Sequence, residues 1–140
     1  MISTKGRYAV RIMIDLGQHH EMGVPVPLED VARRQNISKK YLEAIVRELV
    51  RAKLVIGLRG KGGGYLLTRA PAEYPIGEIL ECTEGPLAPV ACLAPGAELC
   101  DRAKTCKSLS LWQRYDALTH DFFYKVSLKE VIDEEPLAKE

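Results

Sequence analysis

Hydrophobic residues recur at helical spacing in three early segments of the chain. The first begins after Ser3 or Thr4 and runs to about Gln18, and LEDVARRQ (28–35) forms a second, short helix with acids in its first turn, where the helix dipole favours them. Asn36 ends that helix, and Ser38 caps a third one over residues 38–54. The apolar positions predicted to be buried in the first and third helices are Tyr8, Ala9, Ile12, Met13, Leu16, Leu42, Ile45, Val46 and Leu49.

A strand–turn–strand pattern follows, with VIGLR, GKGGG and YLLTR in succession. The glycines permit backbone angles that are closed to other residues. Three helices followed by a hairpin is the element order of a winged helix-turn-helix. The sequence then predicts a helix at residues 76–85, an irregular loop, and a long helix from Ser108 or Ser110 to about Val126. Ser127 caps a last short helix.

These elements predict a mainly α fold with a small β-hairpin wing, a winged helix-turn-helix joined to a long C-terminal dimerisation helix. We divide the chain into a DNA-binding domain (1–70), a connecting helix and cysteine-rich loop (71–107), and a dimerisation helix with a C-terminal tail (108–140). The long helix carries one apolar side that we expect to pair across a two-fold axis, with Trp112, Tyr115, Leu118 and Phe122 in the interface. The alternative for this side is a core within one chain.

Charge is unevenly distributed along the chain. Residues 1–69 carry 13 Lys/Arg and 6 Asp/Glu, whereas residues 70–140 carry 7 Lys/Arg and 13 Asp/Glu. A basic first half and an acidic second half suit a DNA-binding head on a body that avoids DNA, although chance segregation would give the same pattern. We therefore expect double-stranded DNA as the partner.

The third helix is the candidate recognition helix, because such a helix inserts its N-terminal residues into the major groove. Lys40, Glu43 and Arg47 share one helical face, and Glu43 is able to select cytosine while repelling phosphate elsewhere. Its alternative role is a salt bridge with Arg47. A thin basic wing tip suits the minor groove, although a solvated turn is the alternative. The candidate DNA-binding residues are Ser38, Lys39, Lys40, Tyr41, Glu43, Arg47, Arg59 and Lys61.

Three cysteines, Cys92, Cys100 and Cys106, lie in one loop that prolines and a glycine keep irregular. Their spacing of seven and five intervening residues contains no CxxC pair, which argues against a structural zinc ribbon. Thiolates suit an iron–sulfur cluster, but zinc, a thiol redox switch and unliganded cysteines remain open. Cys82 lies on a predicted helix and is expected to be a small buried hydrophobe.

Other functional classes are less compatible with the sequence. No apolar run approaches the roughly 20 residues of a membrane span, and no signal peptide precedes the first helix, so we expect a cytoplasmic protein with reduced or metal-bound cysteines. GKGGG lacks the GxxxxGK[ST] pattern of a nucleotide-binding loop. We find no paired nucleophile and base, so we do not expect an enzyme.

Several segments together carry a family resemblance: STKGRYAVR, ISKKYLEAIVRELVRAKLV, RGKGGGYLL, EGPLAPVAC and SLW before the long helix. Over nearly all of residues 1–130 the chain resembles the IscR-type family of dimeric winged-helix regulators, which has nitric-oxide-sensing and cysteine-metabolism branches. The cysteine spacing with EGPLAPV is most similar to the branch that senses iron–sulfur status. That resemblance implies Cys92, Cys100 and Cys106 as ligands of a 2Fe–2S cluster, and repression of iron–sulfur assembly genes.

The chain departs from the family pattern at the fourth ligand. The iron–sulfur branch has a histidine three residues beyond the third cysteine, where this chain has Leu109. Nitric-oxide-sensing relatives take an acidic ligand from the first helix, and this chain has Tyr8 at the matching position. The remaining candidates are His19, His20, Glu84, Cys82, Asp101 or an exogenous thiol.

The functional hypothesis is a homodimeric repressor in which cluster binding orders the cysteine loop. This ordering changes how the two DNA-binding heads of the dimer are placed on DNA. The two heads would read half-sites roughly 34 Å apart. Two alternatives remain open. One is a repressor that responds to nitric oxide or to thiol oxidation. The other is a cysteine-metabolism regulator that acts without a cluster.

Overall fold

The computed structural model describes residues 1–21 and 23–137 and is predominantly helical. The order of elements is α1 (Thr4–Gln18), α2 (Leu28–Gln35), α3 (Lys39–Arg51), β1 (Val55–Leu58), β2 (Gly64–Leu67), α4 (Ile76–Glu84), α5 (Leu109–Lys125) and α6 (Leu128–Asp133), with short 3-10 turns at Pro71–Glu73 and Ala91–Leu93. The predicted fold class, a winged helix-turn-helix followed by a long helix, is therefore confirmed.

Local signals set the helix boundaries. The Ser3 side chain caps α1 by accepting a hydrogen bond from the backbone N–H of Gly6, and the Ser38 side chain does the same for Tyr41 in α3. Asn36 ends α2 in the left-handed conformation, with φ 52°. Ser127 and Glu130 cap α6 reciprocally. These starts and stops agree with the sequence prediction.

Several predicted elements were too long, and β1 and α4 each end one residue before the predicted boundary. We expected the third helix to reach Leu54, but α3 ends at Arg51 because Lys53 turns into the left-handed region with φ 60°. This turn brings the Leu54 backbone N–H to the Leu49 carbonyl and starts β1 one residue later. The second strand ends at Leu67 instead of Arg69, because the chain turns toward the 3-10 segment there.

One hydrophobic core joins the head to the C-terminal end of the chain. Ala9, Ile12, Met13, Leu42, Ile45 and Leu49 are all fully buried, as predicted, and Tyr8 packs against them half-buried. Leu128 of α6 is also fully buried in this core. Its backbone N–H donates to the Tyr74 carbonyl at 2.8 Å, so the segment that follows α5 is fixed to the segment that precedes α4.

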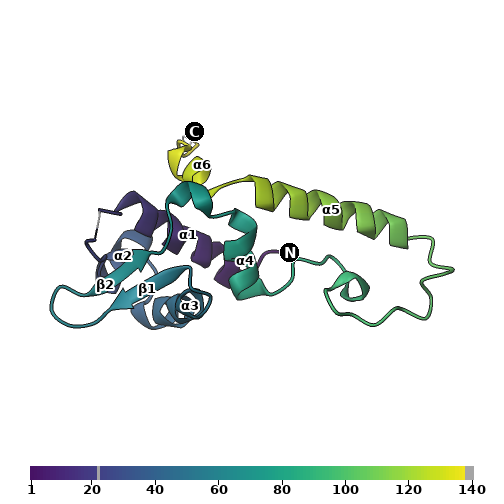
Figure 1. Cartoon of the computed structure of the whole chain (residues 1–140), viewed down its shortest axis with the longest axis horizontal. Coiled ribbons are helices and arrows are strands. Elements are labelled where there is room, and N and C mark those ends of the chain that lie inside the picture. Colours follow the sequence, from purple (N-terminus) through teal and green to yellow (C-terminus); the bar gives the residue numbers. More distant parts are fainter. Residues whose placement is uncertain (22, 138–140) are drawn as a thin grey trace.

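The long helix α5 projects from this head (Figure 1). No α5 residue is buried, and the helix meets α4 near its C-terminal end, where the Tyr124 hydroxyl donates to Glu81 at 2.5 Å. The cysteine loop joins α4 to the far end of α5 and lies beside that end, away from α2 and the hairpin (Figure 1). The fold thus separates a compact head from a projecting helix and loop.

Candidate nucleic-acid interface and cysteine loop

The outward face of α3 carries charged side chains and its inward face carries the core. Leu42, Ile45, Val46 and Leu49 are at most 1% exposed, whereas Lys39, Lys40, Glu43 and Arg47 are exposed. Tyr41 is half-buried and its ring meets the edge of the Tyr8 ring, with the centroids 5.6 Å apart. The charged positions predicted from helical spacing therefore all reach the surface.

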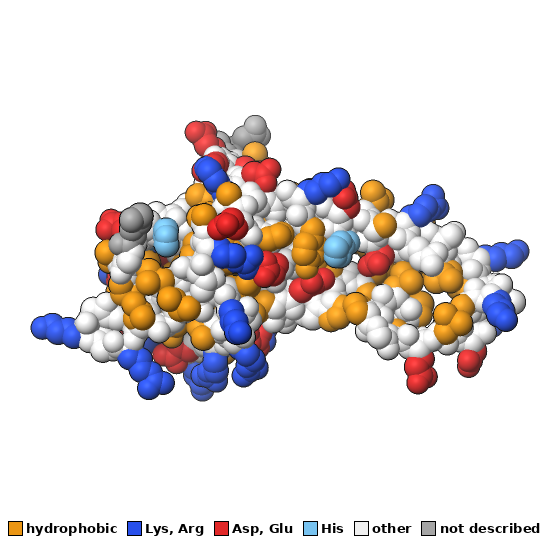
Figure 2. Space-filling view, in the orientation of Figure 1, with side chains coloured by type: hydrophobic (Ala, Val, Ile, Leu, Met, Phe, Trp, Pro, Cys, Tyr) orange, Lys and Arg blue, Asp and Glu red, His pale blue; other side chains and the backbone are white. Residues whose placement is uncertain are grey.

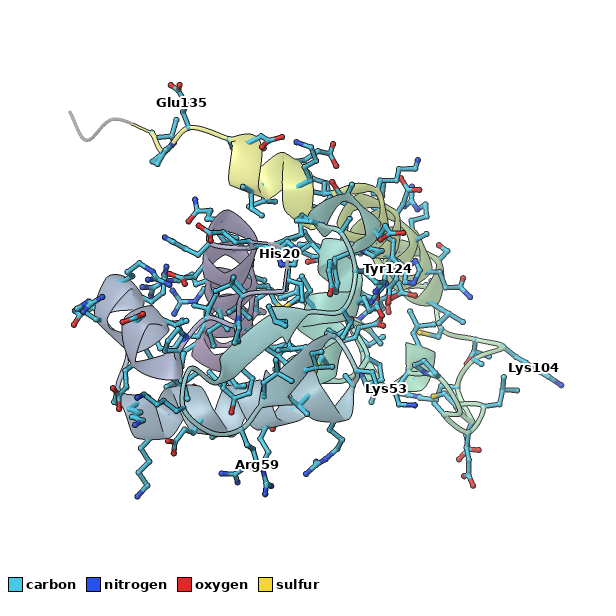
Figure 3. All side chains as sticks on the ribbon, turned by 60° about the vertical axis from the view of Figure 1, so that its left-hand side comes forward. His20, Lys53, Arg59, Lys104, Tyr124 and Glu135 are labelled. Carbon is cyan, nitrogen blue, oxygen red and sulfur yellow. The ribbon has the colours of Figure 1, made fainter. Side chains whose placement is uncertain are left out.

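The hairpin is held against the head by a third extended segment. Val26, just before α2, exchanges both backbone hydrogen bonds with Tyr65 of β2, at 2.8 and 2.9 Å. Gly64 allows this approach, because a Cβ there would lie 2.3 Å from the Val26 carbonyl oxygen. The exposed side chains of Arg59 and Lys61 lie at the tip, beyond β1, and Arg59 points away from the body in Figure 3.

An open cleft lies between the recognition helix, the start of α2 and the hairpin. Its volume is about 660 Å³, and its polar and charged lining comes from Glu29, Lys39, Glu43, Arg47, Arg59 and Tyr65. Lysine and arginine side chains gather along the lower edge of the head, over α3 and the hairpin (Figure 2). The place of α2 in this surface was not predicted, because nothing in the α2 sequence shows that its first turn faces α3.

The cations on this surface differ in their partners. Lys39 donates to Glu29 of α2 at 2.7 Å, whereas Lys40, Arg47, Arg59 and Lys61 make no ion pair within the described residues. Glu43 makes no ion pair with Arg47 in that part of the chain either, so the salt bridge considered for it is not formed. Most of this surface is therefore available to an anion.

The pKa shifts at the start of α2 and α3 agree with this pairing. The hydrogen bond from Lys39, followed by its charge, lowers the pKa of Glu29. The same bond to Glu29 raises the pKa of Lys39, and the charge of Glu43 adds a smaller rise. Two carboxylates therefore act on one ammonium group.

The cysteine loop is built from local turns. Its backbone hydrogen bonds join residues three apart, such as Ala103 to Cys100 and Leu109 to Cys106, at 2.9 and 3.4 Å. Cys92, Cys100 and Cys106 are all exposed. No group of three or more Cys, His, Asp or Glu side chains is gathered as a metal site within residues 1–21 and 23–137.

Cys106 differs from Cys82 in its environment. The Ser108 hydroxyl lies 3.4 Å from Cys106 Sγ, and hydrogen bonding from this hydroxyl lowers the pKa of the Cys106 thiol. Cys82, which we expected to be buried, packs half-buried against the core, and burial raises the pKa of its thiol. The loop therefore holds the more acidic thiol of this pair.

The candidates for a fourth ligand lie in separate places. Glu84 accepts hydrogen bonds from the Ser3 backbone N–H at 2.9 Å and from the Ser3 hydroxyl at 2.5 Å, at the N-terminus of α1. His19 ends α1, with Nδ1 2.9 Å from the Asp15 carbonyl oxygen. Leu109, at the position of the family's histidine, is the first residue of α5. Glu84 and His19 are therefore engaged within the head rather than with the loop thiols.

The predicted interface residues of α5 form an exposed apolar face. Trp112, Tyr115, Leu118 and Phe122 are 37–70% exposed. Beside them lies an open groove of about 600 Å³, which Leu118, Phe122, Phe123, Ile2 and Leu87 help to line. Large apolar side chains exposed together are typical of an interaction surface.

Sequence patterns missed a buried polar network between α1 and α2. Asp15 is 1% exposed and accepts from Arg34 Nη2 at 2.7 Å, from Arg34 Nε at 3.0 Å and from Gln35 at 3.0 Å. The helical spacing of apolar positions predicted only the α1 core and gave no signal for an acid among them. The network fixes α2 against α1 and so positions the Val26–Glu29 edge of the cleft.

These features define a DNA-binding protein of the winged helix-turn-helix class. The family model named Rrf2, described as an iron-dependent transcriptional regulator, matches residues 2–134. The chain therefore belongs to the Rrf2 family of transcription regulators, which confirms the resemblance found in the sequence.

Relatives and solved structures agree with this assignment. The HTH-type transcriptional regulator IscR of Pectobacterium carotovorum subsp. carotovorum (strain PC1) is 35% identical over 94% of this chain and 79% of its own length. The global cysteine regulator CymR of B. subtilis superimposes with a TM-score of 0.81 at 34% identity, over 97% of this chain and 98% of that one. IscR of T. potens does so with a TM-score of 0.75 at 30% identity, over 100% and 93%.

The chain is thus an IscR-like, DNA-binding transcription regulator. No helix within the described residues is long and apolar enough to cross a membrane.

Proposed function

We propose that this regulator is a homodimeric repressor whose DNA binding responds to a 2Fe–2S cluster held by Cys92, Cys100 and Cys106, and that it controls iron–sulfur assembly genes. The observation that carries the proposal is the position of three exposed thiols on one loop, between the helix that ends the head and the projecting α5. A cluster bound there would supply a group that is sensitive to iron supply and to oxidants.

The donor chemistry of the loop fits this cofactor. Thiolates are the usual protein ligands of 2Fe–2S clusters, and the Ser108 hydroxyl already lowers the pKa of Cys106. Because the loop is held by local turns, its thiols can be gathered without breaking contacts in the core. A fourth ligand then comes from a partner chain or from one of the sequence candidates other than Cys82, because the Cys82 thiol packs half-buried against the core and burial raises its pKa.

The proposed dimer uses the exposed face of α5. Burying Trp112, Tyr115, Leu118 and Phe122 against a second copy would remove a large apolar surface from water. The groove beside α5 gives a second helix a place to pack. Two heads related by a two-fold axis would present two α3 helices to half-sites roughly 34 Å apart.

The cysteine loop has a contact route to the recognition helix through α1. The loop follows Glu84, which holds the N-terminus of α1 through Ser3. In the first turn of α1, Lys5 donates to Glu48 of α3. We propose that ordering of the loop shifts α4 and α1. Through the contact of Lys5 with Glu48, this shift changes the orientation of α3 on DNA.

DNA contacts are proposed for Ser38, Lys39, Lys40, Tyr41, Glu43, Arg47, Arg59 and Lys61. Lys40 or Arg59 replaced by alanine should weaken binding and reduce the salt slope by about one if the lost contact is to phosphate. Glu43→Ala should broaden the range of sequences bound. The Glu43 carboxylate repels phosphate and gains a compensating hydrogen bond only from a matching base such as cytosine. Unchanged selectivity would remove Glu43 from the specificity role.

The experiment that tests the proposal compares operator binding by anaerobically purified wild type, Cys92→Ala and Cys82→Ala. The operator is selected from a random duplex library by the wild-type protein. We expect Cys92→Ala to change affinity or selectivity, and Cys82→Ala, which lies outside the loop, to behave like wild type. Equal affinity and selectivity in all three proteins would contradict cluster control of DNA binding.

A second candidate function is regulation without a cluster, either by thiol oxidation or by a metabolic partner. The similarity to CymR, the global cysteine regulator of B. subtilis, favours this candidate. Under a metabolic partner, alanine at all three loop cysteines would leave DNA binding unchanged. Under a thiol or nitric-oxide response, the reagent would change DNA binding of iron-free protein.

A further inference from the structure

The edge of the DNA-facing cleft contains an ion pair that joins two helices. Glu29, in the first turn of α2, accepts a hydrogen bond from Lys39, in the first turn of α3, at 2.7 Å. The neighbouring acid, Asp30, pairs within its own helix with Arg33 at 3.1 Å. Only one of the two acids in the first turn of α2 therefore reaches across to α3.

The pair lies where phosphate is expected. Lys39 is at the N-terminal end of α3, where recognition helices enter the groove and where the helix dipole also favours anions. Both Glu29 and Lys39 line the cleft that also contains Arg47 and Arg59. The Glu29 carboxylate therefore accepts the hydrogen bond from the Lys39 ammonium group that a phosphate oxygen of DNA would otherwise accept.

The pair is also exposed enough to exchange partners. The side chain of Lys39 is 52% exposed and that of Glu29 is 75% exposed. Water and salt screen a pair of this kind, so its contribution to folding is small and it opens readily. DNA, with its dense array of phosphates, competes strongly for the same ammonium group.

We propose that Glu29 is an internal competitor for DNA phosphate, which holds Lys39 in the free protein and must release it when DNA binds. This inference rests on the DNA-binding function. It assigns to Glu29 a role in setting affinity for all DNA sequences, because a phosphate contact carries no sequence information. Glu43 has a different position, since it makes no ion pair with Lys39 and lies further along the exposed face of α3.

The test is a double-mutant cycle on Glu29 and Lys39. Binding to the selected operator and to a scrambled duplex of equal length is measured by fluorescence anisotropy at several salt concentrations. Glu29→Gln should raise affinity for both duplexes about fivefold and steepen the salt slope by up to about one. In a Lys39→Gln background the same substitution should change affinity by less than about twofold.

A matched control separates the pair from general charge effects. Asp133→Asn removes an acid from another exposed lysine pair, with Lys129, on α6. This substitution changes the net charge equally and should leave both affinities unchanged. Circular dichroism of each variant checks that the fold is retained.

The outcomes are distinct. An equal or larger gain from Glu29→Gln in the Lys39→Gln background would mean that Glu29 simply repels phosphate, and would overturn the inference, as would no gain at all. If neither wild type nor Glu29→Gln binds any duplex, the DNA-binding function fails and the inference fails with it.

Discussion

Tyr74 fixes the base of the wing to the head, and its hydroxyl is the most informative group to remove. The side chain is fully buried. The hydroxyl donates to the Leu54 carbonyl at 2.8 Å and accepts from the backbone N–H groups of Thr68 and Arg69 at 2.8 and 2.9 Å. These partners flank the start of β1 and the end of β2, so one hydroxyl ties both strands to the segment before α4.

The cost of Tyr74→Phe follows from what each partner loses. The Leu54 carbonyl still accepts from the Thr68 hydroxyl at 3.2 Å, and the Thr68 N–H retains a longer bond to Leu54 at 3.4 Å. The Arg69 N–H loses the bond at 2.9 Å. Two replaceable bonds at about 0.5 kcal/mol each, and one orphaned donor at about 1–3 kcal/mol, predict a loss of about 2–4 kcal/mol in the free energy of unfolding.

The assay is urea unfolding followed by circular dichroism, at one fixed protomer concentration because dimerisation adds to the apparent stability. A loss of this size should lower the midpoint by roughly 1–2 M urea. Tyr65→Phe is the matched control, because the Tyr65 hydroxyl has no hydrogen-bond partner within the described residues. Its effect should stay within about 0.5 kcal/mol. A Tyr74→Phe midpoint equal to that of Tyr65→Phe would refute this reasoning.

Three further predictions concern the network, the thiols and the dimer. Arg34→Ala should lower the free energy of unfolding by about 2–3 kcal/mol, because it leaves the buried Asp15 carboxylate without its cation, and Arg33→Ala should cost less than about 0.5 kcal/mol in the same urea titration. In cluster-free protein at pH 7.5, iodoacetamide should alkylate Cys106 at least about tenfold faster than Cys82, as measured by mass spectrometry. The lowered pKa of Cys106 favours the reactive thiolate, whereas the raised pKa of Cys82 disfavours it. Ser108→Ala should slow the alkylation of Cys106, and equal rates at the two cysteines in the wild type would count against this explanation. Leu118→Glu should give a monomer in sedimentation velocity, because it puts a carboxylate in the proposed apolar interface, while Leu137→Glu in the tail should not; a Leu118→Glu dimer would place the interface elsewhere.

Local signals predicted the helices and the core well. Ser3, Ser38 and Ser127 cap helices through hydrogen bonds to residues three positions away, so the sequence contains the whole signal. Apolar spacing on α3 predicted its buried and exposed faces for the same reason. The left-handed turn at Lys53 was missed, because a lysine carries no preference for that conformation.

Contacts between helices could not be predicted from spacing. Glu29 and Lys39 are ten residues apart, and Asp15 and Arg34 are nineteen apart. Their pairing depends on how α1, α2 and α3 pack, which apolar spacing alone does not determine. The three loop thiols were identified by type and proximity in sequence, but whether they meet depends on what binds them.

The most direct test of the central claim is an anaerobic purification with a visible absorption spectrum and an iron and sulfide assay on the same sample. Cys92→Ala and Cys82→Ala are purified in parallel. We expect near-equal iron and sulfide with broad absorption between roughly 400 and 500 nm in wild type and Cys82→Ala, and neither iron nor this absorption in Cys92→Ala. A colourless wild-type protein that also resists reconstitution with iron and sulfide would contradict the cluster and leave only the DNA-binding half of the account.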